Sequence, residues 1–199
     1  MNRIRALVFG GSRANAHLTA IVAMMLVPLL AAEGATLLDV RSLLTVHAFI
    51  GLLLVPVIAL KLGSTGWRLL SYYRRREEYV LHGPPQLVIR VLVAPVLVAS
   101  TVLLFGTGIA LLALDQTEGM LVGLHKASFL VWVGALGLHV LTRLPVLLRS
   151  LRLRLAGTSL RIAVATLSVV AGVGLATLML PAMDHLQDNV SAHVGVDAH

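Results

Sequence analysis

Residues 120–147 read MLVGLHKASFLVWVGALGLHVLTRLPVL. This stretch is long enough and apolar enough to cross a bilayer, which takes about 20 residues of α-helix. It carries two histidines, His125 and His139. At about 100° per residue, the 14 residues from one to the other return to within roughly 40° of the same helix face and rise by about 21 Å. One face of this helix therefore presents a histidine near each surface of a membrane.

Four more stretches of the chain have the same character, and they cover residues 14–32, 43–66, 86–114 and 158–181. None of them alternates polar and apolar residues with period two, as the strands of a membrane barrel do. The 199 residues are 58% hydrophobic and 13% charged, whereas about a quarter of the residues of a soluble domain are charged. The composition therefore excludes an ordinary soluble protein and predicts an all-α integral membrane protein.

Short polar links separate the five stretches, so we expect a single membrane domain over residues 1–199. Within this domain, residues 13–147 are expected to form a four-helix transmembrane bundle, and residues 158–181 a fifth transmembrane helix. Residues 183–199 are expected to form a polar tail on the outer side of the membrane. We expect the first link, residues 33–42, to be a loop between the first two spans.

The arginines predict the orientation of the chain, because cytoplasmic loops of membrane proteins are enriched in Lys and Arg. Twelve of the 16 basic residues fall on one side of the predicted membrane. They are Arg3, Arg5, Arg13, Arg68, Arg74, Arg75, Arg76, Arg143, Arg149, Arg152, Arg154 and Arg161. The loops of the other side hold Arg41 and seven acidic residues. We therefore expect a cytoplasmic N-terminus and an external C-terminus, and the net charge of +7 requires no nucleic-acid partner.

An alternative interpretation of the first stretch is a secretory signal peptide. Basic residues, a short apolar run and small residues such as Ala31 and Ala32 follow one another there, as in such peptides. Glu33 and Gly34 fit a cleavage site poorly, and cleavage would remove His17. We favour a retained transmembrane helix.

The histidines inside the predicted spans fall at two depths. His47 lies about one turn inside the second span and His125 a similar depth inside the fourth, both near the outer end. These two spans run parallel, so their outer histidines can face one another across a bundle, as the two axial ligands of a haem must. Gly51 lies one turn from His47 on the same face, where a missing side chain leaves room for a flat macrocycle. The alternative for Gly51 is that small residues merely let helices pack closely.

His139 needs a partner near the inner surface, and two residues qualify. His17 follows Arg13 by four residues and His139 precedes Arg143 by four, so both lie one turn from an arginine of the inner leaflet. Lys61 follows the outer histidine of its own span at the spacing that separates the two histidines of the fourth span, so it shares that histidine's face. A neutral lysine can ligate haem, but an intramembrane lysine more often reaches for headgroups or pairs with a haem propionate. We favour His17 as the ligand and keep Lys61 as the alternative.

The remaining histidines lie in a loop or in the tail, where we expect water to solvate them. They are His82, His185, His193 and His199. The chain has no cysteine, which excludes disulfides, iron–sulfur clusters held by this chain and covalent c-type haem attachment. The alternative for the four intramembrane histidines is that each is a satisfied polar residue in a helix interface, but their two matched depths and the repeated spacing argue against it.

The stretches around these histidines resemble the bacterial cytochrome b561 family and the related cytochrome b subunits of nickel–iron hydrogenases and formate dehydrogenases. The similar stretches are Val46-His47-Ala48-Phe49-Ile50-Gly51 and Leu124-His125-Lys126 continuing to Trp132. The family has a four-helix dihaem core, with one histidine in each of its first two spans and two in the fourth. The resemblance covers residues 13–147. It implies two haem b groups, whose iron is ligated by His17 with His139 on the cytoplasmic side and by His47 with His125 on the outer side. One departure is Leu18, because an aromatic residue often follows the first-span histidine of the family.

These observations lead to one leading hypothesis, an integral membrane b-type cytochrome in a bacterial cytoplasmic membrane. It would pass electrons across the membrane between quinone or menaquinone and a redox partner subunit. The spans contain no nucleophile–base pair or phosphate-binding loop, so the chemistry falls to the cofactor. One alternative is a non-catalytic membrane anchor or assembly subunit with one haem or none. Another is a small transporter that uses the histidines and Lys61 as a proton relay, although the chain lacks the internal repeats common in transporters.

Overall fold

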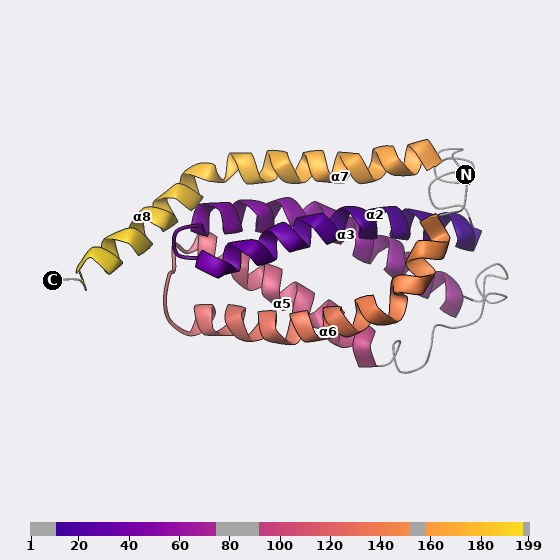
Figure 1. The fold of residues 1–199 in the computed structure, drawn as a ribbon, viewed down its shortest axis with the longest axis horizontal. Coiled ribbons are helices and arrows are strands. Elements are labelled where there is room, and N and C mark those ends of the chain that lie inside the picture. The colour runs from indigo at the N-terminus through magenta and orange to yellow at the C-terminus, as the bar shows by residue number, and fades with distance from the viewer. Residues whose placement is uncertain (1–10, 75–91, 152–157, 197–199) are drawn as a thin grey trace.

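The computed structural model describes residues 11–74, 92–151 and 158–196, and within these ranges the chain consists of helices joined by short turns and contains no strand. Its long helices are α2 (Gly11–Thr36), α3 (Leu44–Tyr73), α5 (Ala94–Ala113), α6 (Met120–Leu151) and α7 (Thr158–Leu178) (Figure 1). A 3-10 turn, η1 (Leu37–Asp39), follows α2, and α8 (Leu180–Val196) follows α7. The prediction of an all-α protein is confirmed.

Five of the described helices are long and apolar enough to cross a membrane. Their outward faces carry large apolar side chains that no other part of the chain covers, such as Val27 at 54% exposure, Leu130 at 68% and Leu167 at 66%. In water such a surface would be unfavourable over so large an area. Acyl chains solvate it instead, so the chain is a multi-pass membrane protein.

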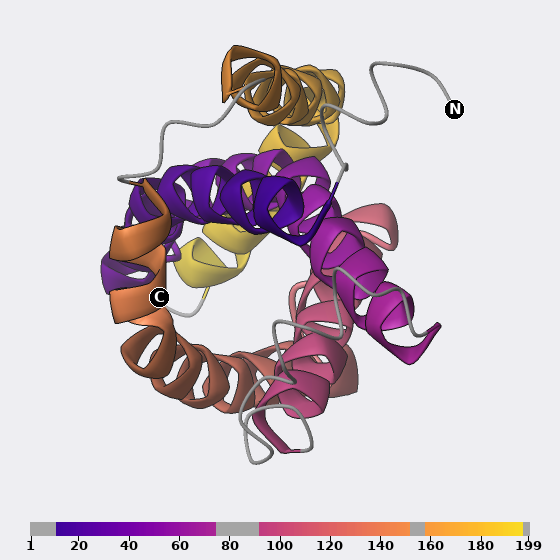
Figure 2. The same cartoon turned by 90° about the vertical axis from the view of Figure 1, so that its right-hand side faces the viewer.

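Four helices form a ring around a common axis (Figure 2). Around the ring α2 packs on α3, α3 on α5, α5 on α6, and α6 returns to α2. This order places α3 and α6 diagonally opposite one another. Both run from left to right in Figure 1, so they are parallel, as the short links predict.

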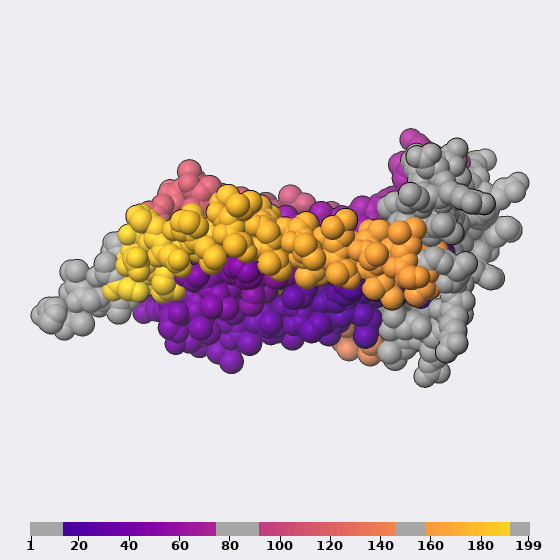
Figure 3. Space-filling model, turned by 90° about the horizontal axis from the view of Figure 1, so that it is seen from above, coloured from indigo at the N-terminus to yellow at the C-terminus, as the bar shows by residue number. Residues whose placement is uncertain are grey.

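The fifth long helix, α7, lies outside this ring and packs along α2 and α3 (Figure 3). The backbones of α7 and α3 approach closely at Gly172, where an added Cβ would collide with the main-chain carbonyl of Leu53. Ala165 and Ala176 of α7 are fully buried in the same interface. Leu18 and Leu54 pack with Ala165 in one buried apolar cluster, which joins α2, α3 and α7.

The predicted loop at residues 33–42 is wrong at its start, because α2 continues to Thr36. The Thr36 hydroxyl donates to the Glu33 carbonyl at 2.6 Å, and η1 then turns the chain toward α3. A charged residue normally ends an apolar span, which is why the sequence argument places Glu33 in the loop. Its carboxylate instead turns inward from the last turns of the helix, with only 18% of the side chain exposed.

Other predicted boundaries shift outward, since α3 continues to Tyr73 and α6 to Leu151. The third predicted span begins at residues 86–91, which lie outside the described residues. Within the predicted outer tail, residues 183–199, the described residues up to Val196 are helical. The chain bends after α7 and continues as α8, with Pro181 in the first turn, where a missing N–H costs nothing.

Helix α8 crosses one end of the molecule and ties its segments together. Met183 and Leu186 are buried, and Gln187 donates from Nε2 to the carbonyl of Arg41 at 2.7 Å. Asn189 donates to the Asp115 carboxylate at 2.8 Å, in the turn between α5 and α6. We call this end the outer end and the opposite one the inner end, after the orientation that the arginines predict.

Candidate functional site

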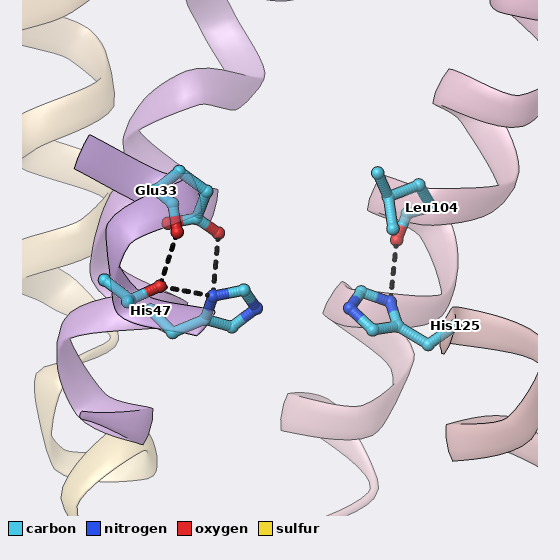
Figure 4. A network of polar contacts seen from close by, with 5 residues as sticks. Glu33, His47, Leu104 and His125 are labelled. Atoms are coloured by element: carbon cyan, nitrogen blue, oxygen red, sulfur yellow. Dashed lines mark hydrogen bonds and ion pairs between the residues drawn. The ribbon is translucent and has the colours of Figure 1, made fainter. Parts of the chain in front are cut away.

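Two histidines face one another across the outer end of the ring. His47 extends from α3 and His125 from α6, so they come from the diagonally opposed helices. Their ring centroids are 6.4 Å apart and their planes are nearly perpendicular, at 88°. Figure 4 shows that the ring nitrogens not engaged in hydrogen bonds point toward one another. The predicted approach of these two residues at one depth is confirmed.

The surroundings of His47 decide which of its ring nitrogens carries the proton. Its Nδ1 lies 2.9 Å from the Thr36 hydroxyl and 3.1 Å from Oε1 of Glu33 (Figure 4). The Thr36 hydroxyl already donates its hydrogen to the Glu33 carbonyl, so it accepts from the ring. Nδ1 is therefore the donor, and in a neutral ring Nε2 keeps its lone pair.

The same reasoning applies to His125. Its Nδ1 lies 3.1 Å from the carbonyl oxygen of Leu104, and a carbonyl can only accept. The hydroxyl of Thr107 is 3.0 Å from the same nitrogen and donates its own hydrogen to the Leu103 carbonyl at 2.7 Å. Here too Nδ1 carries the proton and the lone pair of Nε2 faces the space between the helices.

Two opposed lone pairs repel one another unless an electron-pair acceptor lies between them. With a metal–nitrogen bond of about 2.0 Å on each side, and each nitrogen about 1.1 Å from its ring centre, two ligating rings would stand about 6.2 Å apart. The observed separation of the His47 and His125 centroids is 6.4 Å. Metal-ligating histidines also commonly donate their second N–H to a carboxylate or a main-chain carbonyl, as both of these do. The pair therefore fits the axial coordination of one metal centre.

Two glycines lie beside the histidine pair and its hydrogen-bonding partners. A Cβ added to Gly108 of α5 would lie 3.2 Å from Cε1 of His125, so only a glycine leaves the ring its full room. A Cβ added to Gly51 would lie 3.6 Å from Oε1 of Glu33, an ordinary contact. Gly51 thus lies beside the carboxylate that holds His47.

The inner histidines are arranged differently. His17 of α2 is 4% exposed, and the positive charge of Arg161 on α7 lies near it. His139 of α6 is half-buried, with the positive charges of Arg143 and Lys61 near it. Among the described residues His17 and His139 make no ring contact, and both have a buried Nδ1 without a hydrogen-bonding partner. Arg13, the other predicted arginine of this site, lies in α2, but its side chain is outside the described part of the structure.

Lys61 lies near His139, and it forms a hydrogen bond to the main chain of α2. Its Nζ donates to the main-chain carbonyl of Thr19 at 2.7 Å. The Thr19 hydroxyl lies 3.0 Å from the Ser64 hydroxyl and 3.3 Å from Oδ1 of Asn15. A polar network thus joins α2 to α3 inside the membrane, directly below the outer histidine of α3.

Residues that the sequence did not single out hold the outer pair, and these are Glu33, Thr36, Leu104, Thr107 and Gly108. Only Glu33 carried a signal, as an isolated carboxylate at the end of an apolar span. Thr36 ends α2 and contacts His47 of α3. The roles of Leu104, Thr107 and Gly108 depend on how α5 is rotated against α6. That rotation is fixed by contacts such as Trp132 Nε1 donating to Thr101 Oγ1 at 3.0 Å.

No protein-family model, curated protein or solved structure matches the chain.

Proposed function

We propose that the chain is an integral membrane cytochrome of the b type, which binds a haem between α3 and α6 through His47 and His125. One observation carries this proposal. The two rings approach to 6.4 Å with both Nδ1 atoms anchored, so that both Nε2 lone pairs face the same point. In both rings Nδ1 carries the proton, so both Nε2 atoms are free to bind a metal. Histidines that only satisfy hydrogen bonds within a helix interface need not share one tautomer or face one another.

The number of ligands favours haem over a bare metal ion. Zinc and similar ions need four protein or water ligands, and commonly three or more from the protein. In the described part of the chain no group of three or more His, Cys, Asp or Glu residues could hold a metal ion. A metal that brings four equatorial ligands in a macrocycle needs only two from the protein. The chain has no cysteine, so such a haem would be held without covalent attachment.

The residues of the site divide the work between ligation and orientation. His47 and His125 would hold the iron, and the bound haem would supply a one-electron redox couple. Glu33 and Thr36 orient the His47 ring, and the Leu104 carbonyl and Thr107 orient the His125 ring. Hydrogen bonds of this kind make a ligand more basic and tune the potential of the metal.

We extend the proposal to a second haem b at the inner level. His139 lies about four helical turns from His125, which is about 21 Å along α6, and both lie on its less exposed face. We favour His17 as the second inner ligand, in agreement with the resemblance to the cytochrome b561 family. A pair of haems at these two levels would relay electrons across a bacterial cytoplasmic membrane, with the N-terminus inside, between quinone or menaquinone and a redox partner subunit.

The test is the haem content of the protein purified in detergent, measured by the pyridine haemochrome assay and the reduced-minus-oxidised spectrum. The proposal predicts two haems b per chain, and loss of one in each of the variants His125→Ala and His139→Ala. His185→Ala is the matched control, because this side chain lies on α8 and is 69% exposed. One haem per chain that only His125→Ala removes would restrict the proposal to the outer site. A haem-free protein would refute it and favour a membrane anchor without a cofactor.

A further inference from the structure

The polar network around Lys61 has no role in holding the outer histidines. Lys61 lies inside the apolar span of α3, and its Nζ is held by the Thr19 carbonyl at 2.7 Å. Ionisable residues inside membranes are costly, and they usually serve a ligand, an ion or a proton. The hydrogen bond to the Thr19 carbonyl does not neutralise the positive charge of Lys61, so we expect an anion to lie near it.

The Lys61 side chain turns across to α2 and is not extended toward the headgroups. A lysine near a membrane surface commonly extends its side chain toward the headgroups, whereas the Nζ of Lys61 donates to the main-chain carbonyl of Thr19. Arg68 follows Lys61 by seven residues, about 10 Å along α3, and is the basic residue of this helix that the sequence places at the inner surface.

No carboxylate of the described residues lies near this cation. The described acidic side chains are all at the outer end, and they are Glu33, Asp39, Asp115, Glu118, Asp184 and Asp188. The charges at the level of His139 are Lys61 and Arg143, both positive. Buried charges in a medium of low dielectric constant need a counter-ion.

A second observation comes from Asn15, which is fully buried in the same network. Its Oδ1 lies 3.3 Å from the Thr19 hydroxyl, whereas its Nδ2 has no hydrogen-bonding partner in the part of the chain that is described. A buried amide donor without an acceptor is unfavourable by roughly 1–3 kcal/mol. Lys61 and Asn15 together therefore present N–H donors and one positive charge, which is the complement of a carboxylate.

We propose that Lys61 and Asn15 bind the carboxylate groups of the ligand that occupies the inner level, which are the propionates of the second haem. This inference rests on the proposed function. It assigns Lys61 as an anchor and leaves the axial positions of the inner haem to histidines. An ammonium that donates to a carbonyl has no lone pair for a metal, and its nitrogen is held against the α2 backbone.

Two substitutions of Lys61 separate anchoring from ligation. Lys61→Arg keeps a positive donor that binds carboxylates but cannot ligate iron, and Lys61→Met removes both abilities. Thr177→Ala is the control, because its exposed hydroxyl donates to the Val173 carbonyl of α7, outside the ring. Haem content, retention of the inner haem against an apo-haem acceptor and the resolved midpoint potentials are measured for each purified variant.

We expect Lys61→Arg and Thr177→Ala to retain two haems with unchanged axial spectra. Lys61→Met should retain the outer haem, which also shows that the variant is folded, and should lose the inner haem about 10-fold to 100-fold more readily. Where inner haem remains in Lys61→Met, its midpoint potential should be lower, because a positive charge near the propionates favours the reduced state.

Loss of the inner haem in Lys61→Arg, or a changed axial spectrum, would make Lys61 a ligand and overturn the inference. So would full retention in Lys61→Met, or a wild-type protein with only the outer haem. Native mass spectrometry with phosphatidylglycerol tests the other source of an anion. If Lys61→Met loses bound lipid and keeps both haems, the anion is a lipid phosphate and the inference is wrong. A wild-type protein without haem is a separate outcome, which refutes the proposed function itself.

Discussion

Gly108 allows a specific test of the outer site, because a methyl group added there would press on the ring of the proposed ligand His125. The Cβ of Gly108→Ala would lie 3.2 Å from Cε1 and 3.6 Å from Nδ1 of His125. Relaxed carbon–carbon contacts are about 3.5–4.0 Å, so the ring must retreat by roughly 0.3–0.8 Å. The bond to the Leu104 carbonyl at 3.1 Å limits that movement. Ligand sites need their geometry to within about 0.5 Å, so we expect haem affinity at this site to fall about 10-fold to 100-fold.

The assay is haem retention against an apo-haem acceptor, with thermal unfolding measured in parallel. Gly106→Ala is the matched control on the same helix, because a Cβ there meets nothing within 4 Å. Alanine is a better helix former than glycine, so neither variant should lose helix stability. We therefore expect weaker haem retention only in Gly108→Ala. Equal retention in the two variants would refute the proposed position of His125 as a ligand.

Two further predictions test the surroundings of the site. Glu33→Ala should weaken outer haem binding about 10-fold to 100-fold, since Thr36 remains as the only acceptor for His47 Nδ1; the exposed Asp39→Asn serves as the control, and an equal effect of both would contradict an oriented carboxylate. Gly172→Ala should separate α7 from α3, because its Cβ collides with the Leu53 carbonyl, and should destabilise the protein by about 1–3 kcal/mol in chemical unfolding. Haem content should be unchanged in Gly172→Ala, and Gly174→Ala, whose Cβ meets nothing within 4 Å, should have neither effect.

The approach of His47 and His125 could be predicted from sequence because it depends on few quantities. Span ends and arginine placement give the depth of each histidine, and short links make the second and fourth spans parallel. The two rings then fall at one level whatever the detailed packing. Their contact at 6.4 Å agrees with that argument.

The residues that hold the rings could not be predicted in the same way. Thr107 and Gly108 reach His125 only because α5 is rotated so that this face meets α6. The sequence predicts Glu33 in the loop because a carboxylate is unfavourable in lipid. In the structure it lies within α2, where His47 in the first turn of the next helix is its partner. Met183 and Leu186 lie three residues apart after Pro181, and this spacing is the sequence signal for α8 that the polar composition of the tail obscured.

The predicted approach of His17 and His139 at the inner level has no counterpart among the described contacts. The two residues lie at matching distances from the nearest arginines, but equal depth in the membrane does not decide toward which neighbouring helix each side chain points. The positive charge near His17 is that of Arg161 on α7, whereas those near His139 are Lys61 and Arg143. The haem count of His139→Ala therefore tests the inner site independently of the outer one.

The most direct test of the central claim is the electron paramagnetic resonance spectrum of the oxidised protein. Two axial imidazoles at 88° give a low-spin ferric haem with a strongly anisotropic signal and a large maximum g value. We predict such a signal for the outer haem in the wild-type protein and its disappearance in both His47→Ala and His125→Ala. A wild-type protein without this large-g signal, or persistence of the large-g signal after either substitution, would contradict axial ligation by these two histidines, whereas the inner haem retains its own low-spin signal in both variants.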